Sequence, residues 1–246
     1  MIALHLIGIG TGNPRHLTGE AVDALNAADL ILVPRKENAR DLADLRQTIC
    51  AAVLTRDVPI ASFAMPVRAG EGDYLQAVHD WHDAIATAWR TAIVRHLPGG
   101  GKVALLVWGD PSLYDSSLRI AARFAGAGVR VVPGITSIQA LTAAHAIPLN
   151  PLAGPVTITT GRLLRAHGWP NGADSLVVML DAGGAFEALD PQGVTIWWGA
   201  YLGMPEQALA HGPLAEAGPK ILATRAALRA RHGWIMDVYL LRKDPR

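Results

Sequence analysis

Apolar and polar positions follow two alternating patterns over the first 134 residues of the chain. Short apolar runs that end in glycine or proline are typical of strands buried on both faces of a sheet. Between these runs, apolar side chains recur at the spacing of amphipathic helices. The pattern predicts strands over 2–10, 30–34, 102–110 and 129–134, and helices over 19–29, 41–54, 74–97 and 117–128. This alternation favours a mostly parallel sheet that is covered by helices on both faces.

The pattern changes after Pro133. A helix is predicted over 135–149, and strand-like runs with fewer helices between them follow at 155–161, 175–180, 194–203 and 233–242. This order is typical of an α+β domain with a mixed sheet. No long Gly/Ser-rich or Pro-rich linker separates the halves. We therefore expect two α/β domains, residues 1–134 and 135–246, with a cleft between them.

Composition narrows the class of protein. Half of the 246 residues are apolar and 17% are charged, which fits a compact soluble protein. The net charge of +1 offers no general attraction to nucleic acid or anionic lipid. The single cysteine, Cys50, forms no disulfide framework or thiolate metal cage, and we expect a buried, inert thiol. Without a signal peptide or a membrane-length apolar run, we expect a cytoplasmic protein with no metal, nucleic-acid partner or membrane partner.

Three glycine-bearing turns follow predicted strands. They read GIGTGNPRHLT at 8–18, WGDPSLYDS at 108–116 and VPGITS at 132–137. The carboxyl ends of parallel strands meet at one edge of a sheet, where α/β proteins bind small molecules. We therefore expect these turns to converge. Ordinary tight turns between strand and helix remain the alternative for each loop taken alone.

The first turn lacks the sequence features that bind a pyrophosphate. Asn13 stands at the third glycine position of the dinucleotide fingerprint, and Arg35 and Lys36 stand where an acidic residue would end the second strand. No Gly-Lys-Ser/Thr sequence follows either, so a phosphate loop is excluded. Glycines still let a ligand approach the backbone closely. A ligand without phosphates fits this loop better.

The three turns resemble the signatures of the tetrapyrrole (corrin/porphyrin) methylase family. TTGR, VVMLD, WWGAYLG and GPL follow in the expected order, so the resemblance covers nearly the whole chain. It departs from the family pattern at Thr11, Asn13 and Trp108, where proline, aspartate and glycine are usual. The resemblance implies two α/β domains, a homodimer, and S-adenosyl-L-methionine (SAM) in the cleft between domains, with S-adenosyl-L-homocysteine (SAH) as product. Further motifs resemble a subgroup that methylates the tetrapyrrole precorrin-5 at ring carbon C-1 and releases acetate during cobalamin biosynthesis.

The resemblance also assigns site residues by motif position. It implies SAM contacts at Gly10, Thr11, Trp108, Gly109, Asp110, Thr136, Ser137, Leu180, Ala200, Pro213 and Leu214. For the last four residues, an ordinary place in the core of the strands is the alternative to SAM binding. Acetate release needs a general base or an oxyanion donor, and Asp110 and Tyr114 are the candidates, with His16 behind them. Asp110 can equally be only a turn residue.

Arginine forks bind carboxylates through two hydrogen bonds, and a tetrapyrrole precursor carries many carboxylates. Five basic residues follow strand ends or glycine turns and are expected to bind this substrate: Arg15, Arg35, Lys36, Arg40 and Arg162.

Several other functions stay open from the sequence. The nearest alternative is another member of this family, which acts at a different ring carbon, on a diphthine precursor or on ribosomal RNA. The near-neutral net charge argues against an RNA substrate. A nicotinamide-dependent oxidoreductase is disfavoured by Asn13 and Arg35. A dimer that senses SAM without turning it over is the third alternative.

Overall fold

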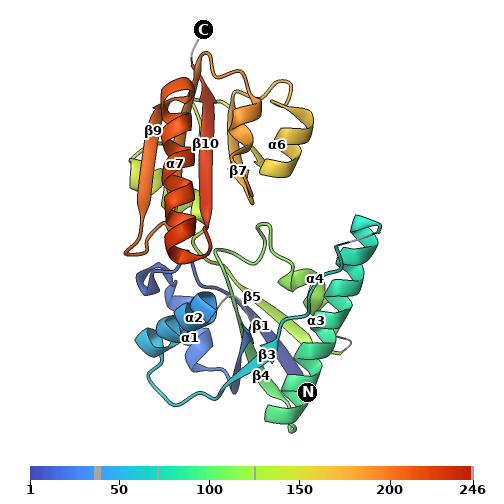
Figure 1. The fold of residues 1–246 in the computed structure, drawn as a ribbon. Coiled ribbons are helices and arrows are strands. Elements are labelled where there is room, and N and C mark those ends of the chain that lie inside the picture. The colour runs from blue at the N-terminus through green and yellow to red at the C-terminus, as the bar shows by residue number, and fades with distance from the viewer. Residues whose placement is uncertain (36–39, 71, 125, 245–246) are drawn as a thin grey trace. The chain divides into compact units, whose positions relative to one another are not determined.

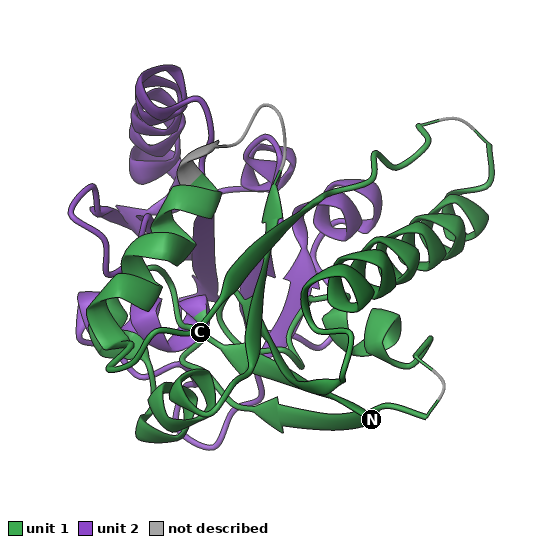
Figure 2. Ribbon diagram, turned by 90° about the horizontal axis from the view of Figure 1, so that it is seen from below, with its two compact units in different colours: residues 1–136 green, residues 137–246 purple. Residues whose placement is uncertain are grey.

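The chain forms two compact units, residues 1–136 and 137–246 (Figure 2). The computed structural model describes residues 1–35, 40–70, 72–124 and 126–244, and for residues 40 and 41 the backbone alone. The sequence prediction placed the boundary two residues earlier, near 134/135. Each unit contains one five-stranded sheet.

Unit 1 alternates strands and helices, as predicted (Figure 1). Its elements are β1 (Ile2–Gly8), η1 (Pro14–His16), α1 (Gly19–Asn26), β2 (Leu30–Arg35), α2 (Arg40–Val53), β3 (Ile60–Ala64), α3 (Tyr74–His96), β4 (Gly101–Val107), α4 (Ser117–Ala121) and β5 (Gly128–Val132). All five strands are parallel, in the order β3-β2-β4-β1-β5. The predicted parallel sheet is confirmed.

Helices cover both faces of this sheet. Leu4 and Leu6 of β1 pack on one face in a cluster with residues of α3 and α4. Ile7, one position further, packs on the opposite face with residues of α1 and α2. Successive side chains of a strand point to opposite faces, so a near-continuous apolar run is needed to fill both cores.

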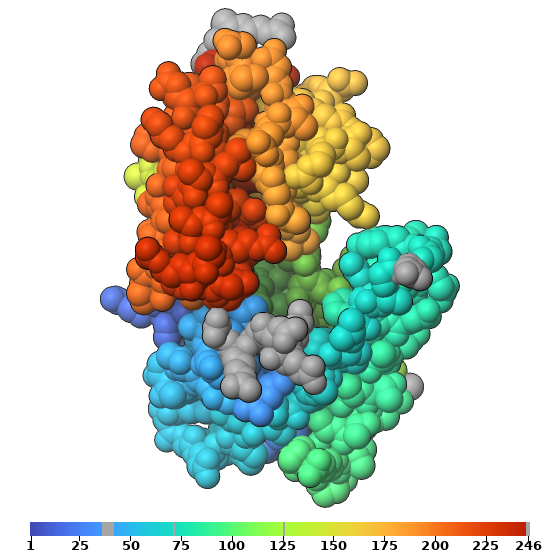
Figure 3. Space-filling model, viewed as in Figure 1, coloured from blue at the N-terminus to red at the C-terminus, as the bar shows by residue number. Residues whose placement is uncertain are grey.

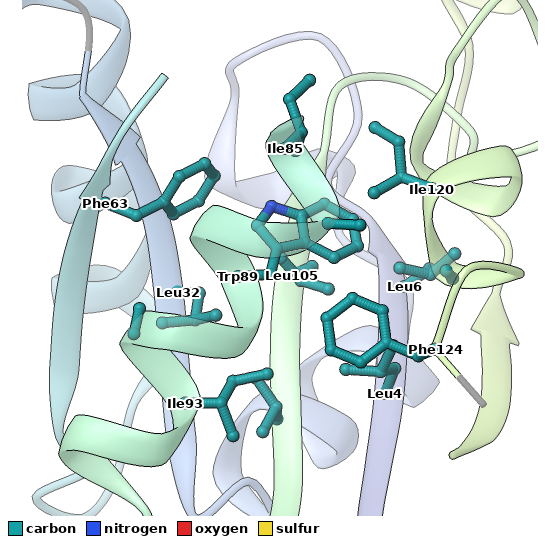
Figure 4. Close-up of a cluster of buried hydrophobic side chains, with 14 of the residues drawn as sticks. Leu4, Leu6, Leu32, Phe63, Ile85, Trp89, Ile93, Leu105, Ile120 and Phe124 are labelled. Carbon is teal, nitrogen blue, oxygen red and sulfur yellow. The ribbon is translucent and has the colours of Figure 1, made fainter. Parts of the chain in front are cut away.

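Trp89 of α3 occupies the centre of the core under α3 and α4 (Figure 4). It is 3% exposed, and its ring contacts Phe63 and Phe124 at centroid distances of 6.4 and 6.0 Å. Phe63 comes from β3, and Phe124 follows α4. One side chain thus links an edge strand, the long helix and the segment after α4.

Unit 2 contains a mixed sheet. Its elements are α5 (Ser137–His145), β6 (Thr157–Thr160), α6 (Gly161–His167), β7 (Ser175–Met179), η2 (Ala185–Ala188), β8 (Val194–Ala200), β9 (Ala208–Pro213), α7 (Leu214–His232) and β10 (Asp237–Lys243). The strand order is β6-β7-β10-β8-β9, with β6 parallel to β7 and the other neighbours antiparallel. This confirms the expected mixed sheet.

Two helices pack on opposite faces of the unit 2 sheet. Ile196 and Trp198 of β8 belong to the same buried cluster as Ile221 of α7. Gly199 faces the other way, against Leu141 of α5. The side chains of α7 (red) form much of the surface of unit 2 on the side shown in Figure 3. No helix in the described parts of the chain is long and apolar enough to cross a membrane.

Some elements differ from the sequence prediction. The segment predicted as a helix over 117–128 is helical only from Ser117 to Ala121, and a turn follows. Six elements were not predicted: the strands β3 and β9, the helices α6 and α7, and the short 3-10 helices η1 and η2. β3 and β9 are edge strands, whose outward side chains face solvent and dilute the apolar signal. The long α7 carries Pro219 inside it, which sequence rules treat as a break.

Replacing Trp89 with alanine should destabilise unit 1 by about 3–5 kcal/mol, because the truncation removes buried area and leaves a cavity. Chemical denaturation would measure the change. Val94→Ala, on the same helix at a side chain that is 61% exposed, is the matched control and should change stability by less than about 0.5 kcal/mol. Equal losses for both variants would contradict the central place of Trp89.

Candidate functional site

The three glycine-bearing loops arise from neighbouring strands of unit 1. β1 lies between β4 and β5, with Gly8 opposite Val107 and Ile7 opposite Val132. Because all three strands are parallel, the segments that follow them leave the same edge of the sheet. The expected convergence of the loops is therefore present in the structure.

The loops touch backbone to backbone. The Gly109 N–H donates to the Gly10 carbonyl at 2.8 Å, and the pair forms an isolated β-bridge. A Cβ at Gly8 would lie 2.6 Å from the Gly134 nitrogen and 2.7 Å from the Gly109 oxygen. A Cβ at Gly134 would collide with that same oxygen. The loops can meet only because these positions carry no side chain.

Asp110 fastens the second loop to the third. Its Oδ2 accepts from the Gly134 N–H at 2.9 Å, and its Oδ1 accepts from the N–H and hydroxyl of Ser112 at 2.8 and 2.5 Å. Burial alone would raise the pKa of this carboxyl, but the hydrogen bonds from Ser112 and Gly134 outweigh it and lower the pKa below 3.8. Asp110 is therefore a carboxylate at neutral pH, held by three donors.

The first loop is ordered by its own side chains. Gly10 has φ +71°, and a Cβ there would lie 2.7 Å from the His16 Cβ. The hydroxyl of Thr11, 9% exposed, lies 3.1 Å from His16 Nδ1, and burial lowers the pKa of His16. The Asn13 side chain accepts from the Arg15 N–H at 2.9 Å. Asparagine thus caps the short η1 helix where the family pattern has aspartate.

Trp108 packs against a buried arginine that sequence reasoning missed. The Arg46 guanidinium of α2 lies 4.8 Å from the centre of the Trp108 ring, and Arg46 is 8% exposed. Arg46 donates to the carbonyls of Leu106 and Leu42, each at 3.3 Å. Burial lowers the pKa of Arg46 to about 10, so the group stays charged at neutral pH. The only signal for Arg46 in the sequence is an arginine within a helix, which usually faces solvent.

Unit 2 brings two of its predicted residues to one edge of its sheet. Leu180 directly follows β7, and Ala200 ends β8 opposite Asp237, the first residue of β10. The pairing of β10 with β7 places Leu180 on the other side of Asp237. Leu180 has φ +52° and is 65% exposed, whereas Ala200 is fully buried. An exposed leucine with positive φ is uncommon and marks this edge.

Pro213 and Leu214 lie elsewhere in unit 2. β9 is antiparallel to β8, and Pro213 pairs with Thr195 near the start of β8. Ala200 lies five positions after Thr195 along the strand, a distance of about 17 Å. Leu214 is 3% exposed in the core. The structure does not bring these two residues to the edge that carries Leu180 and Ala200.

The remaining predicted residues are spread over both units. Tyr114, in the second loop, has φ +49° and is 42% exposed. Thr136 and Ser137 are half-buried after β5. Three predicted substrate residues are exposed at carboxyl ends of strands or in the loops after them: Arg15 in η1, Arg35 at the end of β2 and Arg162 in α6. Arg40 begins α2, and Lys36 lies outside the described residues.

Among the described residues, no group of three or more His, Cys, Asp or Glu side chains is placed to hold a metal ion. Cys50 is 1% exposed, and burial raises the pKa of its thiol to about 11. The expectation of a buried thiol is confirmed. The polar groups at the loops instead include main-chain amides and carbonyls, the Asp110 carboxylate, and the hydroxyls of Thr11, Ser112, Thr136 and Ser137.

The family profile of the tetrapyrrole (corrin/porphyrin) methylases matches residues 3–218. The chain belongs to this family. A precorrin-6A synthase [deacetylating] from Sinorhizobium sp is 47% identical over 246 residues, covering 97% of this chain and 94% of that protein. A precorrin-2 C(20)-methyltransferase from Sinorhizobium sp is 32% identical over 173 residues, covering 66% of each.

Solved structures show the same fold. A putative cobalamin synthesis related protein from Corynebacterium diphtheriae superimposes with a TM-score of 0.85 at 38% identity, covering all of both chains. A uroporphyrin-III C-methyl transferase from Thermus thermophilus, complexed with S-adenyl homocysteine, has a TM-score of 0.59 at 19% identity and covers 98% of this chain and 97% of that one. The second likeness supports the fold alone. The predicted family and fold class are confirmed.

Gly134→Ala should destabilise unit 1 by about 1–3 kcal/mol, because the added Cβ must push the Gly109 and Gly8 backbones away. Denaturant unfolding would measure the loss. Gly128→Ala is the matched control: Gly128 begins the same strand, β5, and a Cβ there meets nothing within 4 Å. If Gly134→Ala were as stable as Gly128→Ala, the close packing of the loops would be wrong.

Asp110→Asn should lower the free energy of unfolding at neutral pH, because one amide oxygen cannot replace two carboxylate oxygens that accept three hydrogen bonds. A carboxyl whose folded pKa is depressed contributes stability above its unfolded pKa and loses it as pH falls through the folded value. The gap between wild type and variant should therefore be constant above about pH 5 and shrink as the pH falls below 3.8. Unfolding curves from pH 7 to pH 2 would test this, and a gap independent of pH would contradict it.

Proposed function

We propose that this chain is a SAM-dependent methyltransferase that methylates precorrin-5 at C-1, releases the acetyl group as acetate and yields precorrin-6A. The observation that carries the proposal is the 47% identity to a precorrin-6A synthase [deacetylating] over 97% of this chain. The TM-score of 0.85 to a cobalamin synthesis related protein over the full length supports it. Relatives that act at other ring positions match at lower identity over a smaller share of the chain.

The residues at the two strand edges suit SAM. This donor has no phosphate, so it needs short-range polar groups and apolar surface more than a cluster of cations. Unit 1 offers glycine turns whose main chain can approach a ligand, with the hydroxyls of Thr11 and Thr136 beside them. The hydroxyl of Ser137 follows directly in the chain. Unit 2 offers the exposed apolar side chain of Leu180.

Methyl transfer requires alignment more than acid–base chemistry. The bond between sulfur and the methyl carbon breaks as the bond between that carbon and the ring carbon forms, and the sulfur leaves as the neutral thioether of SAH. Holding two reactants in line is worth about 7–11 kcal/mol. Loops that are tied together by backbone contacts, as at Gly8, Gly109 and Gly134, suit this demand for fixed positions.

Acetate release is a second kind of chemistry. Water adds to the ketone carbonyl, the carbon–carbon bond to the ring breaks, and its electron pair stays with the ring. A carboxylate that already accepts three hydrogen bonds is a weak base, so Asp110 suits the role of holding the loops together. We therefore assign the assisting group to Tyr114, which is exposed in the same loop and can donate to the developing oxyanion.

The tetrapyrrole substrate would bind through its carboxylates. Arg15, Arg35 and Arg162 are exposed and end or follow strands at the edges that carry the loops, which is the placement such a role needs. Arg40 and Lys36 remain predicted members of the same set. The homodimer and the cytoplasmic location also remain predictions.

The test is direct. Calorimetry should show SAM, and not NAD, binding to the purified chain. Incubation with precorrin-5 and SAM carrying a ¹³C-labelled methyl group should then yield SAH, acetate and a tetrapyrrole that has gained one methyl and lost the acetyl group. The label should appear at C-1 by carbon NMR.

Each other outcome identifies a rival. A label at another ring carbon without acetate would indicate a different member of the family. SAM binding without any turnover would indicate a sensor, and NAD binding an oxidoreductase. Any of these three results overturns the proposed reaction.

A further inference from the structure

Arg225 of α7 carries a buried positive charge, and its guanidinium makes several hydrogen bonds. Its side chain is 10% exposed, and its Nε donates to Asp237 Oδ2 at 2.8 Å. One terminal nitrogen donates to the Asp181 carbonyl at 2.6 Å, and the other donates to the Ala182 carbonyl at 3.3 Å. The guanidinium thus joins the first residue of β10 to two successive carbonyls of the loop after β7.

Both of its acidic neighbours have further partners. The Asp237 carboxylate, 5% exposed, also accepts from the Trp198 indole N–H at 2.9 Å. The Asp181 carboxylate, 2% exposed, accepts from the Tyr239 hydroxyl at 2.8 Å and from the backbone amides of Gly183 and Ala185 at 3.1 and 2.5 Å. Burial would raise the pKa of Asp181, but these hydrogen bonds, together with the Arg165 guanidinium 3.3 Å from Oδ1, outweigh it and lower the pKa.

This network fixes the loop from both sides. The carboxylate of Asp181 holds the amides that follow it, and Arg225 holds the carbonyls of Asp181 and Ala182. Leu180, the residue just before, is kept at φ +52°, a conformation that costs a leucine about 1–3 kcal/mol and persists only when its surroundings enforce it. In that conformation, its side chain stays 65% exposed at the carboxyl edge of β7.

We propose that Arg225 is a positioning residue for the methyl donor, acting by holding Leu180 exposed at the strand edge so that it covers the adenine ring of SAM. This inference rests on the proposed function. Adenine is the one flat, largely apolar part of SAM, and an exposed leucine is the apolar surface that suits it. Burying charged groups and holding Leu180 in a strained conformation are both unfavourable. A role in presenting Leu180 to a ligand would explain why the protein keeps this network.

An arginine is needed for the geometry. Its planar fork reaches two carbonyls and a carboxylate at once, whereas a lysine ammonium is a point charge on a flexible stem. Arg225→Lys therefore keeps the charge opposite Asp237 and loses the fork that holds the Asp181 and Ala182 carbonyls. The same change at Arg229, which is exposed on the same helix, is the matched control.

The experiment is a double-mutant cycle on SAH binding, measured by calorimetry below the unfolding transition of every variant. Leu180→Ala and Arg225→Lys should each weaken SAH binding about ten-fold, and the double variant should be no weaker than either single one. Arg229→Lys should bind as the wild type does. In turnover, Arg225→Lys should raise KM for SAM and leave kcat at saturating SAM nearly unchanged.

A purely structural role for Arg225 would lower the unfolding midpoint and leave SAH affinity unchanged, or would give losses that multiply in the double variant. Either result overturns the inference. If Arg225→Lys does not fold, Asp237→Asn removes the charge that anchors the guanidinium and should show the same coupling to Leu180→Ala. Wild-type protein that binds no SAH would instead contradict the proposed function itself, so the two failures are distinguishable.

Discussion

Direct backbone contact among Gly8, Gly109 and Gly134 is the constraint on which the arrangement of unit 1 depends. Three neighbouring parallel strands end there, and a Cβ at Gly8 or Gly134 would collide with the backbone of the neighbouring loops. The Asp110 carboxylate then ties the second loop to the Gly134 amide. These contacts are short and leave little freedom for the loops to move, which suits a reaction whose rate depends on alignment.

In unit 2, a different kind of contact holds the loop after β7 in place. This unit uses a buried network of charges, with Arg225 between Asp181 and Asp237, rather than contact between glycines. A buried ion pair gives little net stability unless its remaining hydrogen-bonding groups are satisfied. In this network, the described contacts satisfy them with an indole, a phenol and four main-chain groups. The local result is the strained, exposed position of Leu180 at the strand edge.

Much of the fold could be predicted because strands buried on both faces of a sheet must be apolar on both faces. The runs that became β1, β4 and β7 carry this signal, and so do the helical periods of α2 and α3. The edge strands β3 and β9 escaped prediction, since their solvent-facing positions obscure the pattern. The predicted site residues of unit 1 follow strand ends that topology brings together. Pro213 and Leu214 were assigned by motif position, and motif position does not reveal that β9 runs antiparallel to β8.

The sequence by itself determined the two kinds of sheet and the three glycine loops, because local composition decides strand burial and turn geometry. Its motifs carried the resemblance to the family. Only the tertiary structure decided which side chains those loops rely on. Arg46 at the Trp108 ring and Arg225 at the loop after Leu180 are single arginines on helices, indistinguishable in sequence from solvated ones. Their burial follows from packing against strands far away in the chain. Long-range contacts of this kind leave no local pattern, and so no reading of the sequence alone could have found them.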